Sequence, residues 1–337
     1  MDDGLKRRLA ALAESPVLWD CPLREYTSFA IGGPATALIT VEGLAELQRL
    51  LAFVREQKIA WRMIGRGTNL LVSDAGFDGV IFILGKGFAR ISQLRTEPNS
   101  VQQGTKLVID EAGSEAGEGI IVQAGAGCSL ARLVNWCGDQ GLTGLEFAAG
   151  IPGTIGGAVI MNAGAWGGEI AGVLASVTVV TPTGEVRTLP RAELDFGYRI
   201  WHDYLRQLQT GAETPGHGAV RPIVVGVELS LAAGDGEQIR NLCQSYREQR
   251  RMKQPKQEPS AGSFFKNPEG DAAGRLIEAS GLKGMKVGGA MVSPVHANFL
   301  VNCGGATAAD VVELMKKVQE TVQRDSGILL EPEVHFL

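Results

Sequence analysis

The sequence predicts an α+β fold, and three observations support this prediction. Segments with strand-like and helix-like patterns follow one another without strict alternation, which argues against one doubly wound parallel sheet. The chain has 337 residues, enough for two or three domains with buried cores. Glycine accounts for 45 of these residues, about twice the usual ~7%, and many of the glycines cluster in loops after apolar runs.

In the N-terminal half, short apolar runs alternate with helix-like segments. Residues 1–20 place Leu5, Leu9 and Leu12 on one helical face and lack the long apolar core of a signal peptide. Ser129 is expected to cap a helix that ends near Gly141. The polar segment 95–118 is expected to be a long surface loop. The remaining elements expected here are a helix at 43–58 and strands at 61–64, 80–84 and 120–124.

The C-terminal half begins with a hairpin signal, the turn sequence TPTG at 181–184 between two β-branched runs. Residues 205–220 form a second polar segment, also expected to be a loop. Thr307 and Asp310 resemble a capping box, with Asp in place of the usual Glu, and Gly327 ends the helix that follows. The other expected elements are strands at 177–180, 186–189, 223–231, 299–301 and 329–337 and helices at 237–252 and 271–280.

Charge and cysteine content exclude several classes of protein. The net charge is −5 and the pI is about 5.6, so no basic excess favours a nucleic acid or an anionic membrane. The five cysteines are dispersed without a CxxC pair, which argues against a disulfide framework or a structural zinc site. No His/Asp/Glu cluster has the spacing of a metal site.

Residues 147–168 carry no charge, but seven glycines and Pro152 make them a poor membrane-spanning helix.

Three glycine-rich segments suggest a ligand that bears phosphate. They are residues 65–74, 124–127 and 150–157, the last running on to Asn162 and Gly164. Clustered glycines let backbone N–H groups approach an anion closely, although tight turns alone are the plain alternative. The known nucleotide fingerprints are absent, because the position after Gly65 and Gly67 that should hold a third glycine holds Leu70. A Rossmann dehydrogenase and a P-loop NTPase are therefore both disfavoured.

Six motifs in order carry a resemblance to a known family. They are YTSFAIGGPA (26–35), GRGTNLLVSD (65–74), GLEFAAGIPGTIGGA (144–158), FGYR (196–199), SAGSFFKNP (260–268) and LEPEV (330–334). Together they resemble UDP-N-acetylenolpyruvoylglucosamine reductases, flavoenzymes of bacterial peptidoglycan synthesis, from about residue 20 to the C-terminus. The short span between Arg199 and Arg251 resembles the family form that lacks a substrate-capping tyrosine loop.

The resemblance implies an FAD-binding domain of the vanillyl-alcohol-oxidase type, in two lobes, followed by a smaller α+β substrate domain. The expected boundaries are an N-terminal helix at 1–19, the FAD domain at 20–227 with lobes at about 20–92 and 93–227, and the substrate domain at 228–337. The C-terminal strand is expected to return to the active site. The resemblance also implies FAD and NADPH as cofactors, a small UDP-sugar enolpyruvyl ether as substrate, no metal, no obligate protein partner and a cytoplasmic location.

The implied reaction turns an enolpyruvyl ether into a lactyl ether, with a hydride passing from the reduced flavin to C3 and a proton to C2. Ser263 is by resemblance the proton donor; from sequence alone, a turn serine is the simpler interpretation. Arg199 would pair with the substrate carboxylate and, with Glu333, stabilise the enol. Glu331 would share a strand face with Glu333 and remains an alternative to it.

The resemblance further assigns residues that hold the cofactor and the substrate. Lys253, Asn267 and Tyr198 are expected to contact the substrate. His296, judged from the residues alone and as one of only four histidines, is expected to make a structural hydrogen bond, with a ligand role as the alternative. The residues expected to bind FAD are Ile64, Gly65, Arg66, Gly67, Thr68, Asn69, Leu70, Leu71, Gly125, Ala149, Gly150, Ile151, Gly153, Thr154, Gly156, Gly157, Asn162 and Gly164.

Two other functions stay open on the residues alone. One is a different flavoenzyme of the same fold, such as an oxidase of a small alcohol or sugar. Some such oxidases attach flavin covalently through histidine, and the absence of histidine before His202 argues against that linkage here. The other is a catalytically inactive protein that still binds FAD or a UDP-sugar. The joint presence of Arg199, Ser263 and Glu333 argues against such decay.

Overall fold

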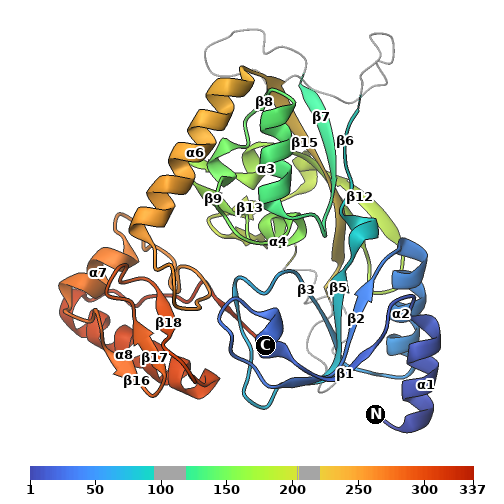
Figure 1. The fold of residues 1–337 in the computed structure, drawn as a ribbon, viewed down its shortest axis with the longest axis horizontal. Helices are drawn as coiled ribbons and strands as arrows, with labels where there is room; N and C mark the ends of the chain where they lie inside the picture. Colours follow the sequence, from blue (N-terminus) through green and yellow to red (C-terminus); the bar gives the residue numbers. More distant parts are fainter. Residues whose placement is uncertain (95–118, 203, 205–220) are drawn as a thin grey trace. The chain divides into compact units, whose positions relative to one another are not determined.

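The computed structural model describes residues 1–94, 119–202, 204 and 221–337 (Figure 1). The two segments expected to be long loops, 95–118 and 205–220, lie outside the described residues. The chain divides into two compact units, which are described one after the other. Unit 1 comprises Met1–Thr40, Glu56–Ile83 and Glu248–Leu337, and unit 2 comprises Val41–Arg55 and Leu84–Arg247.

Unit 1 contains a four-stranded sheet built from the N-terminal part of the chain. Its order is β1-β2-β5-β3, with β1 and β2 antiparallel and β3 and β5 parallel. Cys21, Leu23, Leu38 and Ile81 are buried together in its core. The elements are helix α1 (Asp3–Leu12), strands β1 (Leu18–Pro22), β2 (Pro34–Val41), β3 (Trp61–Ile64) and β5 (Phe77–Leu84), and the 3-10 helix η1 (Leu23–Tyr26).

The N-terminal helix is shorter than the sequence predicts. It ends at Leu12, and Leu18–Pro22 instead pairs with β2. Pro16 explains the difference, because a proline disfavours helical backbone at the residue before it.

The remainder of unit 1 packs helices α7 and α8 with a small antiparallel sheet of order β16-β17-β18 (Figure 1). Phe264, Phe265, Leu314 and Val318 belong to their shared core. The elements are α7 (Ala273–Ala279), β16 (Lys286–Val287), β17 (Ala290–Val292), β18 (Leu300–Asn302), α8 (Ala308–Ser326), β4 (Leu70–Leu71) and β19 (His335–Phe336).

The ends of α8 confirm the sequence prediction. Thr307 and Asp310 form a reciprocal capping box, in which each side chain accepts a hydrogen bond from the other residue's backbone N–H. Gly327 ends the helix in the left-handed conformation, with φ +75°. The long strand predicted at 329–337 is wrong in extent: only His335–Phe336 joins a ladder, and Pro332 makes an isolated bridge with Phe265. Proline has no N–H to donate, which interrupts the ladder.

Unit 2 is organised around a six-stranded antiparallel sheet. Its order is β12-β11-β15-β7-β6, and β8 pairs with the far end of β15. The predicted hairpin is confirmed, because β11 pairs with β12 and the Gly184 N–H donates to the Thr181 carbonyl at 2.8 Å. The strands are β6 (Ile91–Gln93), β7 (Ile120–Gly125), β8 (Leu142–Thr143), β11 (Leu174–Val180), β12 (Val186–Pro190) and β15 (Ile223–Ala233).

Helices and two short hairpins complete unit 2. Ser129 occupies the N-cap of α3 as expected, although its hydroxyl makes no capping hydrogen bond. The helices are α2 (Leu44–Glu56), α3 (Leu130–Asp139), α4 (Ile155–Ile160) and α6 (Gly236–Lys253), the last continuing into unit 1. The hairpins are β9 (Gly164–Ala165) with β10 (Gly168–Glu169) and β13 (Phe196–Gly197) with β14 (Ile200–Trp201). The 3-10 helices are η2 (Lys86–Phe88), η3 (Glu146–Ala148), η4 (Ile170–Gly172) and η5 (Arg191–Glu193).

The mixture of separate sheets and helices confirms the α+β class. Within the described ranges, no helix combines the length and the apolar character that crossing a membrane requires. The same part of the chain holds no group of three or more His, Cys, Asp or Glu side chains that could bind a metal ion.

Candidate active site

Ser263 lies in a turn of unit 1 that is anchored by two buried phenylalanines. Gly262 precedes it with φ +80°, a conformation that glycine adopts without strain. The rings of Phe264 and Phe265 pack edge to face, with centroids 5.3 Å apart, inside the core that α8 covers. Ser263 itself is half-buried. The fold therefore anchors the backbone on one side of the serine, while the serine itself stays partly exposed.

Glu333 lies on the segment next to Ser263. The Glu333 N–H donates to the Phe264 carbonyl at 2.8 Å, and the Lys266 N–H donates to the Glu331 carbonyl at 2.9 Å. Phe265 and Pro332 form the antiparallel bridge between these two hydrogen bonds. Residues about 70 positions apart in the sequence are thus neighbours in one unit.

The two candidate carboxylates differ in their surroundings. The side chain of Glu331 is 74% exposed and lies 3.5 Å from the Lys266 ammonium group. Glu333 is half-buried. Glu331 therefore lies in a solvated surface pair, whereas Glu333 is the carboxylate with the lower exposure beside the Ser263 turn.

The segment 64–71, expected to bind the flavin, is attached to the same C-terminal segment. The side-chain amide of Asn69 donates to the Glu333 carbonyl at 3.0 Å, and the His335 N–H donates to the Asn69 carbonyl at 3.0 Å. From there β4 runs parallel to β19. Gly67 is indispensable to the turn, because its φ is +62° and an added Cβ would lie 2.0 Å from the Tyr26 carbonyl oxygen. Unit 1 thus brings Ser263, Glu333 and the predicted cofactor segment into one hydrogen-bonded frame.

In unit 2, the other two glycine-rich segments lie side by side. The Ile155 N–H donates to the Cys128 carbonyl at 2.9 Å, and the Gly156 N–H donates to the Ala126 carbonyl at 2.9 Å. Thr154 caps α4, with its hydroxyl accepting from the Gly157 N–H at 3.3 Å. These contacts hold residues 125–128 against residues 153–157.

Arg199 lies at the tip of the β13–β14 hairpin, which contacts the predicted cofactor residues Asn162 and Gly164. Its guanidinium donates to the Gly164 carbonyl at 2.8 Å and lies over the Tyr198 ring, 5.1 Å from the centroid. The fully buried Asn162 donates from its amide to the Gly197 carbonyl at 3.0 Å. The oxygen of the Asn162 side-chain amide accepts from the Ala171 N–H at 3.0 Å. Asn162 therefore joins the glycine-rich segment to the hairpin that carries Arg199.

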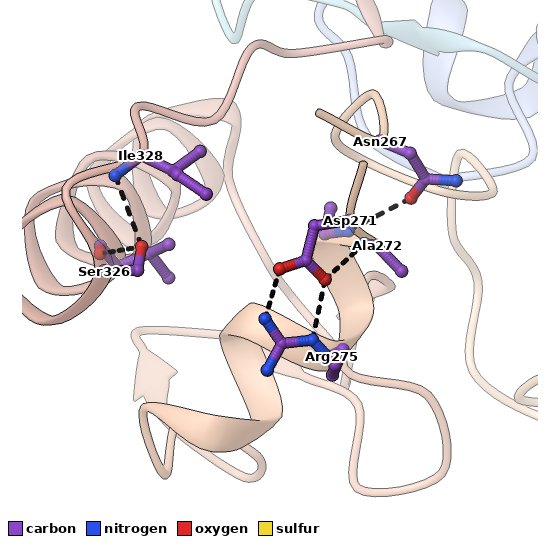
Figure 2. Close-up of polar contacts among 8 residues, drawn as sticks. Asn267, Asp271, Ala272, Arg275, Ser326 and Ile328 are labelled. Atoms are coloured by element: carbon purple, nitrogen blue, oxygen red, sulfur yellow. Dashed lines mark hydrogen bonds and ion pairs between the residues drawn. The ribbon is translucent and has the colours of Figure 1, made fainter. Parts of the chain in front are cut away.

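Lys253 and Asn267 belong to unit 1, and both are exposed. Lys253 is the last residue of α6. Asn267 lies before α7 in the sequence, and its amide oxygen accepts from the N–H of Ala273, the first residue of that helix, at 3.1 Å (Figure 2). Next to it, hydrogen bonds from the Arg275 guanidinium and the Ala272 N–H lower the pKa of Asp271 to about 2. Tyr198, the third residue expected to contact substrate, is 49% exposed and belongs to unit 2.

His296 makes the structural hydrogen bond that the sequence predicts. Its Nδ1 accepts from the Asn298 N–H at 3.2 Å, and its ring packs edge to face on Phe299. Burial lowers the pKa of His296, which favours this neutral, accepting form. Sequence reasoning selected His296 and passed over Asn298, whose buried amide bonds the backbone beside Ser263.

Comparisons with known proteins identify the family. Residues 35–190 match the FAD binding domain model, and residues 254–337 match the model of the UDP-N-acetylenolpyruvoylglucosamine reductase C-terminal domain. A UDP-N-acetylenolpyruvoylglucosamine reductase from Desulfosudis oleivorans is 40% identical over 99% of this chain and 98% of its own length. A second relative of that name, from Symbiobacterium thermophilum, is 42% identical over 93% of this chain and 89% of its own length.

A solved structure agrees with these relatives. The UDP-N-acetylenolpyruvylglucosamine reductase from Thermus caldophilus is 36% identical, with a TM-score of 0.70, and the match covers 95% of this chain and 97% of that one. This likeness and the FAD binding domain match bear out the predicted fold class. The chain therefore belongs to the UDP-N-acetylenolpyruvoylglucosamine reductase family, whose members are FAD-dependent oxidoreductases.

Proposed function

We propose that this protein reduces UDP-N-acetylglucosamine enolpyruvate to UDP-N-acetylmuramate, using NADPH and FAD, in cytoplasmic peptidoglycan precursor synthesis. Family membership supports the reaction. The observation that carries the proposal is the frame in unit 1: Ser263 and Glu333 lie on adjacent hydrogen-bonded segments, and Asn69 of the predicted flavin segment bonds the Glu333 carbonyl. A proton donor, a carboxylate and a cofactor segment are the parts that this reduction requires.

Ser263 is the group that delivers the proton to C2. A serine hydroxyl is a weak acid, but the enol formed at C2 is carbanion-like and strongly basic, so a positioned weak acid is sufficient. FAD, once bound and reduced by NADPH, would supply the hydride that reduces C3. The half-buried position of Ser263 suits this role, since the residue is not sealed in the core while its neighbours Phe264 and Phe265 are buried and anchor the backbone.

Arg199 and Glu333 each have a separate role. The guanidinium of Arg199 would pair in bidentate fashion with the substrate carboxylate and stabilise the charge that develops on it. Glu333 would stabilise the enol through its half-buried carboxyl group. We retain Glu333 rather than Glu331 for this role, because the Glu331 carboxylate is exposed and faces Lys266.

The glycine-rich segments fit a cofactor that must approach the backbone closely. An added Cβ at Gly157 would meet only the Thr154 hydroxyl, at 3.5 Å, so one side of this glycine is open. We assign FAD binding to the residues expected above in 64–71, 149–157 and at Gly125, Asn162 and Gly164. Backbone N–H groups of these segments, other than those of residues 155–157, which are bonded within unit 2, would bind the pyrophosphate.

The substrate residues follow from charge and position. Lys253 ends the basic turn of α6, where Arg250 and Arg251 also lie, and would attract the diphosphate of the UDP group. Asn267 and Tyr198 would supply further polar contacts. We assign residues 20–227 to FAD binding and 228–337 to substrate binding. The matched family regions, 35–190 and 254–337, fall inside these ranges.

The test of Ser263 separates the two half-reactions. In the Ser263→Ala variant, anaerobic bleaching of the flavin absorbance by NADPH should keep its wild-type rate, because that step needs no proton at C2. Recovery of the absorbance on adding the enolpyruvyl substrate should slow by about 10²- to 10⁴-fold.

Ser326→Ala is the matched control, since this hydroxyl bonds the Val322 carbonyl at the end of α8 (Figure 2). It should leave both rates unchanged. Normal recovery in Ser263→Ala would show that another group donates the proton. A wild-type flavin that bleaches but ignores the enolpyruvyl substrate would instead indicate a different substrate.

A further inference from the structure

We propose that Asn298 is a positioning residue that holds the Ser263 turn in the same frame as Glu333. The proposal rests on Ser263 as the proton donor. The side chain of Asn298 is nearly fully buried in unit 1, with 4% of its surface exposed. Its amide reaches the backbone of the residues that follow the serine.

Three hydrogen bonds join Asn298 to these residues. The Phe265 N–H donates to its amide oxygen at 2.9 Å, and its amide nitrogen donates to the Phe265 carbonyl at 2.8 Å. The Phe264 N–H donates to the Asn298 backbone carbonyl at 2.7 Å. The side-chain amide thus imitates the peptide group of a neighbouring strand.

The segment that carries Glu333 is bonded to the same two residues, Phe264 and Phe265. The Phe264 carbonyl accepts from the Glu333 N–H, so residues 264–265 are bonded both to Asn298 and to the segment carrying Glu333. The backbone N–H and carbonyl groups of Phe264 and Phe265 are thus bonded either to Asn298 or to Glu333. A shift of Asn298 would therefore move the serine relative to the carboxylate.

Asn298 is itself held in a tight turn. The Ser293 N–H donates to the Phe299 carbonyl at 2.8 Å, and the Phe299 N–H donates to the His296 carbonyl at 2.9 Å. The Asn298 N–H donates to Nδ1 of His296. The amide is therefore presented to Phe265 from a rigid support, as a positioning residue requires.

Asparagine is suited to this position because it offers a donor and an acceptor at once. Alanine would leave the Phe265 N–H and carbonyl without these partners in a buried site. Aspartate keeps the shape and the acceptor but, when ionised, cannot donate to the Phe265 carbonyl. Protonated aspartate regains a donor, and burial favours this neutral form.

The experiment measures the two half-reactions of Asn298→Ala and Asn298→Asp holoenzymes. Flavin bleaching by NADPH should stay within about twofold of wild type. Recovery with the enolpyruvyl substrate should slow by about 10²-fold, the scale of a 1 Å misplacement, with a larger solvent deuterium isotope effect. In Asn298→Asp, the recovery rate relative to wild type should rise as the pH is lowered. The neighbouring ionisable groups, His296 with Glu278 and Lys283 near it and Glu333 on the facing segment, are present in both proteins, so the ratio of the two rates isolates the new aspartate.

Val318→Ala is the stability control, because Val318 is fully buried in the same core and contacts neither catalytic segment through a polar group. It should lower the melting temperature while leaving the isotope effect unchanged. If the Asn298 variants slow both half-reactions alike, or match Val318→Ala in every measurement, the positioning role is overturned.

A double variant separates this proposal from the assignment of Ser263. The variant combining Ser263→Ala and Asn298→Ala should be no slower than Ser263→Ala, since a positioning residue has nothing left to position. Independent, multiplying losses would overturn the proposal even where Ser263 is the donor. Normal recovery in Ser263→Ala alone would instead overturn the assignment of the donor.

Discussion

At the scale of single residues, Arg199 combines a strained backbone with fixed polar contacts. Its φ is +59°, a left-handed conformation that costs a side chain with a Cβ of the order of 1 kcal/mol. Glycine would remove that cost. The guanidinium bond to the Gly164 carbonyl and the Asn162 bond to the Gly197 carbonyl hold the turn in place. An arginine at such a position is consistent with a functional demand on its side chain.

Arg199→Lys should slow substrate-dependent recovery of the flavin by at least about tenfold, because an ammonium cannot reproduce a bidentate guanidinium pair. Stopped-flow absorbance measures this rate. Arg191→Lys is the matched control, since the Arg191 guanidinium bonds the Ala171 and Leu194 carbonyls in the same unit. It should lower stability rather than the recovery rate. Wild-type recovery in Arg199→Lys would remove this residue from the mechanism.

Two asparagines show the limit of sequence reasoning at this scale. Asn162 is expected to contact the cofactor, and its amide also bonds the Gly197 carbonyl and the Ala171 N–H, which no motif predicts. No motif in the sequence singles out Asn298, although it lies close to His296 in the chain. An asparagine amide suits a ligand and a backbone group equally well, so its role depends on which segment the topology brings opposite it.

At the scale of elements, the capping box of α8 gives a quantitative prediction. Thr307→Ala should lower the free energy of unfolding by about 1 kcal/mol, because it removes the hydroxyl that accepts from the Asp310 N–H. Urea denaturation measures the change. Thr321→Ala, in the body of the same helix, is the control and should be neutral or slightly stabilising, since alanine is the better helix former. An equal loss in both variants would contradict the capping role.

The sequence predicts best the elements whose bounds are set by residues within or next to the element itself. The α8 helix has a cap, a periodic apolar face and a terminal glycine, and the β11–β12 hairpin has a turn signal. The predictions at the two ends of the chain are less accurate. Pro16 and Pro332 interrupt patterns that apolar spacing alone continues through. Local proline chemistry therefore explains both differences.

At the scale of the whole molecule, the motifs name the candidate residues without showing which of them meet. Unit 1 is assembled from three separate stretches of the chain, and residues 64–71 reach Glu333 only through this interleaving. Hydrophobic periodicity reports on neighbours within one element and carries no information about such pairing. The hydrogen bonds between the residues after Ser263 and the segment that carries Glu333 therefore required the structure.

Cofactor binding should be visible in the stability of the whole protein. FAD at 100 times its dissociation constant should stabilise the native state by about 2.7 kcal/mol.

Gly157→Ala should not destabilise the FAD-free protein, because alanine favours the helix and its Cβ meets only the Thr154 hydroxyl at 3.5 Å. It should nevertheless lose most of the stabilisation by FAD, since the added methyl group occupies the open side of the glycine. Gly172→Ala is the control: its Cβ would have no neighbour within 4 Å, and stabilisation by FAD should persist. Thermal unfolding with FAD and with riboflavin at equal concentrations completes the test, because riboflavin lacks the pyrophosphate. Equal stabilisation by both ligands would show that the glycine-rich segments do not bind the pyrophosphate.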